Sequence, residues 1–107
     1  MDRLDTLLQY HDEDPDDSFV CFALASEYVK LGEDDTARAW FEALRDTDPD
    51  YIGTYYHLGK LYERIGEKPL ALDTYRAGAN IATKIADFHA RSELQSALLE
   101  AEGLGFD

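Results

Sequence analysis

Residues 21–49, with the sequence CFALASEYVKLGEDDTARAWFEALRDTDP, decide the fold because their pattern occurs twice in the chain. A shift of 34 residues places this stretch on residues 55–83, YYHLGKLYERIGEKPLALDTYRAGANIAT. The shift pairs identical residues at spaced positions: Leu24 with Leu58, Tyr28 with Tyr62, Gly32 with Gly66, Glu33 with Glu67, Ala37 with Ala71 and Ala43 with Ala77. Agreement at so many spaced positions on one offset indicates an internal repeat.

The repeated residues resemble the tetratricopeptide repeat (TPR), a 34-residue helix–turn–helix unit. The matching residues are Leu24, Ala25, Tyr28, Gly32, Ala37, Phe41 and Pro49 in the first copy, and Leu58, Gly59, Tyr62, Gly66, Ala71 and Tyr75 in the second. The departures are Cys21 and Tyr55 where the family often has Trp, Leu44 and Gly78 where it prefers Ala, and Thr83 in place of the closing Pro. The resemblance implies an all-α array in which the first helix of each repeat, helix A, lines a concave groove that binds another protein.

We expect one domain over residues 1–107, built from stacked repeats. Its parts are an N-terminal half repeat at 1–17, repeat 1 at 18–51, repeat 2 at 52–85, a capping helix at 86–102 and a tail at 103–107. The helices are expected at about 2–11, 18–31, 35–47 and 52–65, followed by one that begins at Pro69. Gly32 and Gly66 supply the turn just past each helix A. Asp17 or Ser18 is expected to cap the first helix A.

Both ends of the chain carry a predicted extra helix. Pro15 lies 34 residues before Pro49, so the N-terminal helix aligns with the second helix of a repeat and covers the first full one. At the C-terminal end, four residues keep helical spacing and predict one inward apolar stripe: Phe88, Leu94, Leu98 and Leu99. The core positions of a third repeat would be polar, at His89, Ser92, Glu93 and Ser96. Residues 83–86 lack Gly and Pro, so the two last helices either fuse or break; we favour a break with Asp87 as N-cap.

The composition excludes several classes of function. With 23 acidic and 10 basic residues the net charge is −13, which disfavours nucleic acid and anionic membrane surfaces as partners. No apolar run is long enough for a membrane span, and residues 1–14 do not resemble a signal peptide. The single cysteine fits a reducing compartment, so we expect a cytoplasmic protein. A halophilic source and a merely acidic mesophilic protein both explain the charge.

We find no residues that predict catalysis, a metal or a cofactor. Asp12, Asp14 and Asp16 have the 1-3-5 spacing of a calcium loop, but the sixth and twelfth positions are Asp17 and Ala23 instead of Gly and Glu. Cys21 takes a core position, which argues against a reactive thiolate. The three histidines are far apart in sequence. We therefore expect that the protein is not an enzyme and needs no cofactor.

The aromatic residues fall into two groups by register. Those at the family's packing positions are expected in the core: Tyr28, Phe41, Tyr55, Tyr62 and Tyr75. Trp40 lies one step off this stripe. It either fills a contact between adjacent repeats, the favoured alternative, or stays half exposed on the convex side.

The predicted binding groove follows from helix geometry. In each helix A, repeat positions 2, 5, 9 and 12 share a face that differs from the packing face. These positions hold Phe19, Phe22, Ser26 and Val29 in repeat 1, and Gly53, Tyr56, Lys60 and Glu63 in repeat 2. With basic neighbours included, the candidate groove residues are Phe19, Phe22, Ser26, Val29, Lys30, Tyr56, His57, Lys60 and Arg64.

Charge suggests what the groove binds. Residues 18–32 carry no net charge and residues 51–68 carry +1, in a chain that is otherwise acidic. We therefore expect a peptide segment of another protein that places an apolar anchor on Phe19 and Phe22 and a carboxylate near Lys60 and Arg64. The family's clamp for a C-terminal carboxylate does not carry over, because Phe22 and Ser26 replace its usual Lys and Asn. Two alternatives stay open: a homo-oligomer that buries the same surface, although we favour a monomer, and a terminal helix that folds over it.

Overall fold

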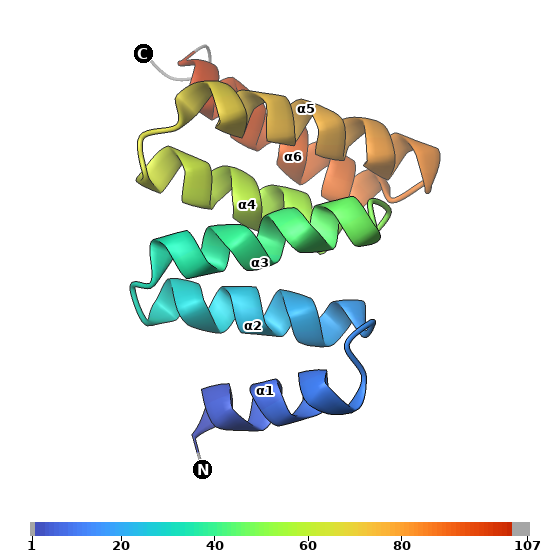
Figure 1. The fold of residues 1–107 in the computed structure, drawn as a ribbon. Coiled ribbons are helices and arrows are strands. Elements are labelled where there is room, and N and C mark those ends of the chain that lie inside the picture. The colour runs from blue at the N-terminus through green and yellow to red at the C-terminus, as the bar shows by residue number, and fades with distance from the viewer. Residues whose placement is uncertain (1, 104–107) are drawn as a thin grey trace. The chain divides into compact units, whose positions relative to one another are not determined.

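The computed structural model describes residues 2–103 of the 107-residue chain and shows six α-helices and no strand within them. The chain forms two compact units, Met1–Tyr51 and Ile52–Asp107, with three helices in each (Figure 1). The division falls at the predicted border between repeat 1 and repeat 2. The all-α prediction is confirmed, whereas the single domain stays a prediction. In residues 2–103, no helix is both long and apolar enough to cross a membrane.

The first unit contains α1 (Arg3–Glu13), α2 (Ser18–Lys30) and α3 (Asp34–Thr47), close to the predicted bounds. Aspartates start two of these helices, because their side chains accept hydrogen bonds from backbone N–H groups that have no partner within the helix. Asp2 accepts one from Asp5 N at 2.9 Å, and Asp17 accepts one from Val20 N at 3.2 Å. Asp17 is therefore the N-cap of α2, as expected.

The turn between α2 and α3 uses glycine for its backbone geometry. Gly32 has a φ of +76°, a conformation that side chains with a Cβ disfavour. Gly32 N donates to Val29 O at 3.1 Å and Glu33 N donates to Tyr28 O at 2.9 Å, the two bonds of a Schellman motif. Gly66 occupies the equivalent turn of the second unit with a φ of +82°. The predicted turn positions are confirmed.

The core of the first unit joins the half repeat to the first full repeat. Leu7 of α1 is buried with a group from α2: Val20, Ala23 and Leu24. Trp40 of α3 packs against this group, stacks on Tyr28 at 6.5 Å and meets the edge of His11 at 4.8 Å. Trp40 thus fills the contact beside the half repeat while staying half-buried. Tyr28 was expected in the core, but it is only half-buried because it lies at the rim beside Trp40.

The second unit contains α4 (Gly53–Arg64), α5 (Lys68–Lys84) and α6 (Phe88–Glu102), in which α5 packs against both α4 and α6 (Figure 1). Its largest fully buried side chains are Tyr62, Tyr75, Leu58, Leu94 and Thr54. Four of the five aromatic residues predicted for the core are buried, Tyr28 being the exception. Pro69 lies in the first turn of α5, where its missing N–H costs no helical hydrogen bond.

A break separates α5 from α6, as favoured over one long helix. Ala86 has a φ of +61°, the left-handed conformation that glycine supplies at the other two turns. Asp87 N donates to Ala82 O at 2.9 Å, and the Asp87 side chain accepts from Ala90 N at 3.0 Å. The hydrogen bonds of this turn and cap hold a residue other than glycine in a conformation that costs about 1–2 kcal/mol.

The apolar stripe of α6 differs from the prediction. Leu94 and Ala97 are buried, whereas Phe88 is 62% exposed and Leu99 is exposed as well. An α-helix turns 100° per residue, so Phe88 and Leu99 lie more than 100° around the helix from Leu94. Equal helical spacing therefore did not identify a single buried face, and the inward face of α6 is narrower than expected.

Candidate functional site

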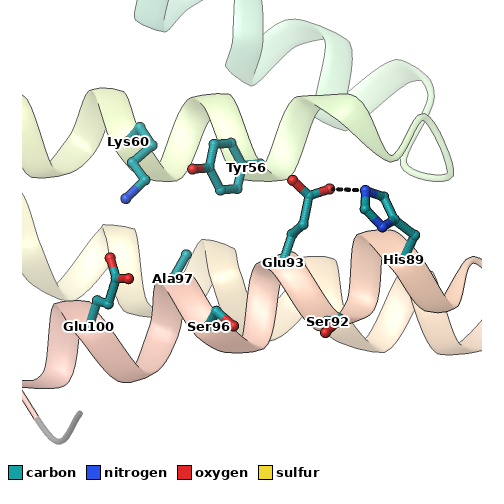
Figure 2. Close-up of a pocket in the computed structure, with 8 residues that line it drawn as sticks. All are labelled: Tyr56, Lys60, His89, Ser92, Glu93, Ser96, Ala97 and Glu100. Atoms are coloured by element: carbon teal, nitrogen blue, oxygen red, sulfur yellow. Dashed lines mark ion pairs between the residues drawn. The ribbon is translucent and has the colours of Figure 1, made fainter. Parts of the chain in front are cut away.

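A groove runs between α4 and α6 of the second unit, and we call it the α4–α6 groove. Its deeper part has a volume of about 250 Å³. Eight residues line this part: Tyr56, Lys60, His89, Ser92, Glu93, Ser96, Ala97 and Glu100. Figure 2 shows Tyr56 and Lys60 on α4, facing Glu93 and Glu100, which extend from α6. The remaining lining residues of α6 continue the same wall.

The groove continues toward the start of both helices. This second part has a volume of about 450 Å³ and shares Tyr56, His89 and Glu93 with the first. It is also lined by Ile52, Gly53, His57, Asp87, Ala90 and Leu94. Apolar atoms dominate this part, so the groove combines an apolar end with a polar, charged end. Such a mixture of apolar contact area and a few polar groups is typical of binding sites.

Lys60 already has charged and aromatic neighbours on its own helix. Its Nζ lies 3.7 Å from Glu63 Oε2 and 5.5 Å from the centre of the Tyr56 ring, the distance of a cation–π contact. Glu63 also accepts a short hydrogen bond from the hydroxyl of Tyr75. Burial, with this hydrogen bond and the Glu63 charge, raises the pKa of Tyr75 far above its ordinary value. Glu63 is thus held in place by both a cation and a buried phenol.

Two histidines flank Glu93 in the groove. His89 Nε2 lies 3.2 Å from Glu93 Oε1, one helical turn away, and Figure 2 marks this contact. Desolvation lowers the pKa of His57 although the residue is exposed overall, and the charge of Glu93 opposes part of that shift. Protonation of either imidazole would place a positive charge beside Glu93. The charge of this end of the groove therefore depends on pH.

The structure brings together three of the predicted groove residues in the second unit. Tyr56 and Lys60 line the deeper part of the groove, and Tyr56 and His57 line its apolar part. Arg64 is exposed near the end of α4 and lines neither part.

The other five predicted residues lie on α2 in the first unit and differ widely in exposure. Phe19 is 62% exposed. Phe22 is half-buried, with ring centres 6.0 Å from Phe41 and 5.7 Å from Tyr51, so it contributes to packing.

The remaining three offer less to a ligand than a free groove residue would. Val29 is half-buried, and Lys30 is exposed with its Nζ 3.9 Å from Glu27. Ser26 Oγ is buried and has no hydrogen-bond partner within residues 2–103. The predicted face of α2 is therefore only partly open, with Phe19 as its most exposed side chain.

The α6 wall of the groove was missed by the sequence prediction. His89, Ser92, Glu93, Ser96 and Glu100 recur at steps of three or four residues, which places them on one face of a helix. We interpreted these positions as the wet outer face of a capping helix. The polar periodicity was visible in the sequence, but nothing local shows that this face meets α4.

Cys21 and the acidic segment before α2 form no candidate site. Cys21 was expected in the core, but it is half-buried because it lies beside the start of α2, where it lines a pocket with Pro15 and Asp16. Burial raises the pKa of its thiol, and the charges of Asp17 and Asp16 add to the shift. Among residues 2–103, no group of three or more His, Cys, Asp or Glu side chains could hold a metal ion.

The fold and the groove define a class of protein: an α-helical repeat array with helix–turn–helix units of 34 residues. Comparison with solved structures then shows the family. The solution NMR structure of a tetratricopeptide repeat domain protein from Salinibacter ruber is 50% identical, covers 88% of this chain and 95% of its own, and has a TM-score of 0.82. A crystal structure of a tetratricopeptide repeat domain protein from the same organism is 51% identical, covers 82% and 99%, and has a TM-score of 0.78.

The chain belongs to the tetratricopeptide repeat family, which confirms the resemblance seen in the sequence. The TPR2B-domain:pHsp70 complex of yeast Sti1 has the same fold, with a TM-score of 0.86 at 17% identity, over 94% of this chain and 80% of the other. No protein-family model and no curated protein sequence matches the chain.

Proposed function

We propose that this protein is a non-catalytic protein-interaction module that binds a peptide segment of a partner protein. The observation that carries the proposal is the α4–α6 groove, an open channel with an apolar end and a charged end on a member of the TPR family. The yeast Sti1 domain of the same fold is found in a complex with pHsp70, which supports a protein as the ligand. A cytoplasmic location is part of this proposal.

The groove suits an extended segment better than a small molecule. Its two parts share three lining residues and follow the length of α4 and α6, so a bound chain could contact several turns of helix. Tyr56 lies in both parts and offers a large, rigid surface with a hydroxyl at one end. Aromatic residues of this kind contribute much of the energy of protein interfaces.

In the first unit, the apolar anchor point of the proposal is Phe19. Phe22 shares its ring surface with Phe41 and Tyr51, whereas Phe19 is mostly exposed. We therefore expect that Phe19→Ala weakens partner binding with little loss of stability. Phe22→Ala is expected to lower stability as well, because it removes packing inside the unit.

A peptide-display selection tests the proposal. Peptides selected on the wild-type protein should bind it and lose most of that binding to Tyr56→Ala. The matched control is Tyr10→Ala, which removes another half-exposed tyrosine, on α1 of the first unit. Equal binding to wild type and Tyr56→Ala would contradict a site in the α4–α6 groove. Circular dichroism of each variant checks that the fold is kept.

A homo-oligomer is the second candidate, because Phe88 of α6 and Phe19 of α2 both expose large apolar surface. A second copy of the chain could bury these side chains. Sedimentation across a wide range of protein concentration distinguishes the two functions. We expect a constant monomer mass, and a mass that doubles with concentration would favour self-association.

A further inference from the structure

We propose that the α4–α6 groove selects a basic partner segment, one that places Lys or Arg side chains between Tyr56 and the carboxylates of α6. This inference rests on the proposed function and names the chemistry of the partner. The lining of the groove includes three carboxylates, Asp87, Glu93 and Glu100, against one fixed cation, Lys60. Charge complementarity therefore favours a cation in the partner.

Lys60 does not offset the acidic wall, because its charge is already used within α4. Its ammonium group is paired with Glu63 at 3.7 Å and rests on the Tyr56 ring. A partner carboxylate at this point would compete with Glu63 and approach Glu100, toward which Lys60 points in Figure 2. The carboxylate that the sequence suggested near Lys60 and Arg64 is therefore disfavoured on electrostatic grounds.

The carboxylates of α6 are spaced along the groove rather than gathered at one point. Glu93 and Glu100 are seven residues apart on one helix, which corresponds to about 10 Å along its axis. Both extend toward α4 in Figure 2, with Tyr56 opposite. Within residues 2–103, Glu100 has no ion-pair partner, and Glu93 contacts only an imidazole. Two basic side chains of one segment can thus each meet a carboxylate.

The aromatic wall of the groove also accepts cations. The Tyr56 ring already lies under the Lys60 ammonium at 5.5 Å, so its face is available to positive charge. Ser92 and Ser96 add hydroxyl oxygens that can accept hydrogen bonds from ammonium or guanidinium groups. A cation in the groove would therefore have charged, aromatic and hydroxyl partners from two helices.

The histidines give the basic-segment proposal a distinct pH response. The titratable groups at the groove are His57, Lys60 and Glu63 on α4, Tyr75 on α5, and Asp87, His89, Glu93 and Glu100 on α6. Acidification protonates the imidazoles first and adds positive charge beside Glu93. A basic segment should then bind less tightly below about pH 6, whereas an acidic one should bind more tightly.

Two synthetic peptides serve as probes. Both are blocked at their ends and contain Gly, Ser and one Phe, and one carries three Arg where the other carries three Glu. Binding to the full chain is followed by NMR titration of backbone amides at low salt. We expect the Arg peptide to bind, with shifts concentrated in residues 53–64 and 88–102, and the Glu peptide to bind at least tenfold more weakly.

Variants separate the groove from general attraction to an acidic protein. Glu93→Gln together with Glu100→Gln should weaken the Arg peptide roughly fivefold. Glu13→Gln removes one exposed charge at the end of α1 and should leave the affinity within error. Unchanged binding to the double variant, or shifts spread over the first unit, would overturn the inference. Preference for the Glu peptide would overturn it while supporting the proposed function, and no binding of either peptide in the groove would count against both.

Discussion

The two repeats fill equivalent positions with side chains of opposite size. In repeat 2, Gly78 faces Tyr55 so closely that an added Cβ would lie 2.5 Å from the Tyr55 Cβ. The equivalent residues of repeat 1, 34 positions earlier, are Leu44 and Cys21, which line one pocket together. A large residue faces a small one in both repeats, but on opposite helices. The comparison teaches that these repeats conserve the filled volume of a contact rather than its residues.

A second pair of positions shows the same trade of size with a change in polarity. A Cβ added at Gly59 would lie only 2.2 Å from Tyr75 Cε1, and the Tyr75 hydroxyl reaches Glu63. The equivalents of Gly59 and Tyr75 in repeat 1 are Ala25 and Phe41, both completely buried, and a valine replaces Glu63. The hydroxyl and its acceptor thus occur together in repeat 2 and are both missing from the equivalent positions of repeat 1.

The two units also differ in charge. Residues 1–51 contain 15 acidic and 4 basic side chains, a net charge of −11. Residues 52–107 contain 8 acidic and 6 basic side chains, a net charge of −2. Most of the self-repulsion of the protein therefore lies in the first unit, whereas the α4–α6 groove lies in a unit that is nearly neutral as a whole.

The largest expected effect comes from exchanging one size pair. Tyr55→Cys should cost about 3–5 kcal/mol of unfolding free energy by leaving a cavity, and Gly78→Leu should cost at least about 3 kcal/mol by overpacking. The double variant restores the repeat 1 arrangement, so it should cost less than the sum of the two changes. Urea unfolding of all four proteins measures the coupling. Strictly additive costs would show that these positions do not exchange volume.

The next effect concerns a position at which the repeats are alike. Ala37 and Ala71 are both completely buried, so each leaves no room for a larger side chain. Ala71→Leu should cost about 1–3 kcal/mol, and Ala37→Leu should cost a similar amount. Thermal unfolding measures both. An unchanged melting temperature for either variant would mean that the repeat register is wrong there.

The Tyr75–Glu63 hydrogen bond should contribute about 1 kcal/mol, so Tyr75→Phe is expected to lower stability by that amount near neutral pH. The matched change in repeat 1 is Phe41→Tyr, which buries a hydroxyl where the nearby equivalent of Glu63 is a valine. It should destabilise the protein instead of strengthening it. A stabilising Phe41→Tyr would contradict the pairing of hydroxyl and acceptor.

The same tyrosine gives an alkaline test. Its pKa is raised in the folded state, so the folded protein keeps the proton after the unfolded chain has lost it. The contribution of Tyr75 to stability is therefore complete below about pH 10, and above it decreases by about 1.4 kcal/mol per pH unit. Tyr75→Phe should flatten this decrease. Urea unfolding at neutral and alkaline pH measures the difference.

The smallest expected effect comes from salt. If the acidic surface is a halophilic adaptation, molar KCl should raise the melting temperature by about 4–8 °C, which corresponds to about 1 kcal/mol in a domain of this size. Hydrogen exchange should show the larger gain in residues 3–47, because the first unit carries most of the charge. A melting temperature that does not change with salt would reject the halophile interpretation and leave the fold unaffected.

Much of the local structure could be predicted from the sequence because it depends on neighbouring residues. Helix bounds follow from apolar periodicity, the turns at Gly32 and Gly66 follow from backbone geometry, and Asp17 and Asp87 act through side-chain oxygens three residues from their donors. Each of these effects acts within one or two helical turns. The 34-residue offset then extended the same argument from one repeat to the next.

The candidate site was only half predictable. The sequence by itself determined the class of fold, the order of the helices and the α4 side of the groove with Tyr56 and Lys60. Only the tertiary structure decided that the polar face of α6 lies opposite them, that Phe88 stays exposed and that Phe22 packs against Tyr51. The physical reason is that a helix sequence encodes which residues share a face, whereas the packing of side chains between helices selects which face turns inward.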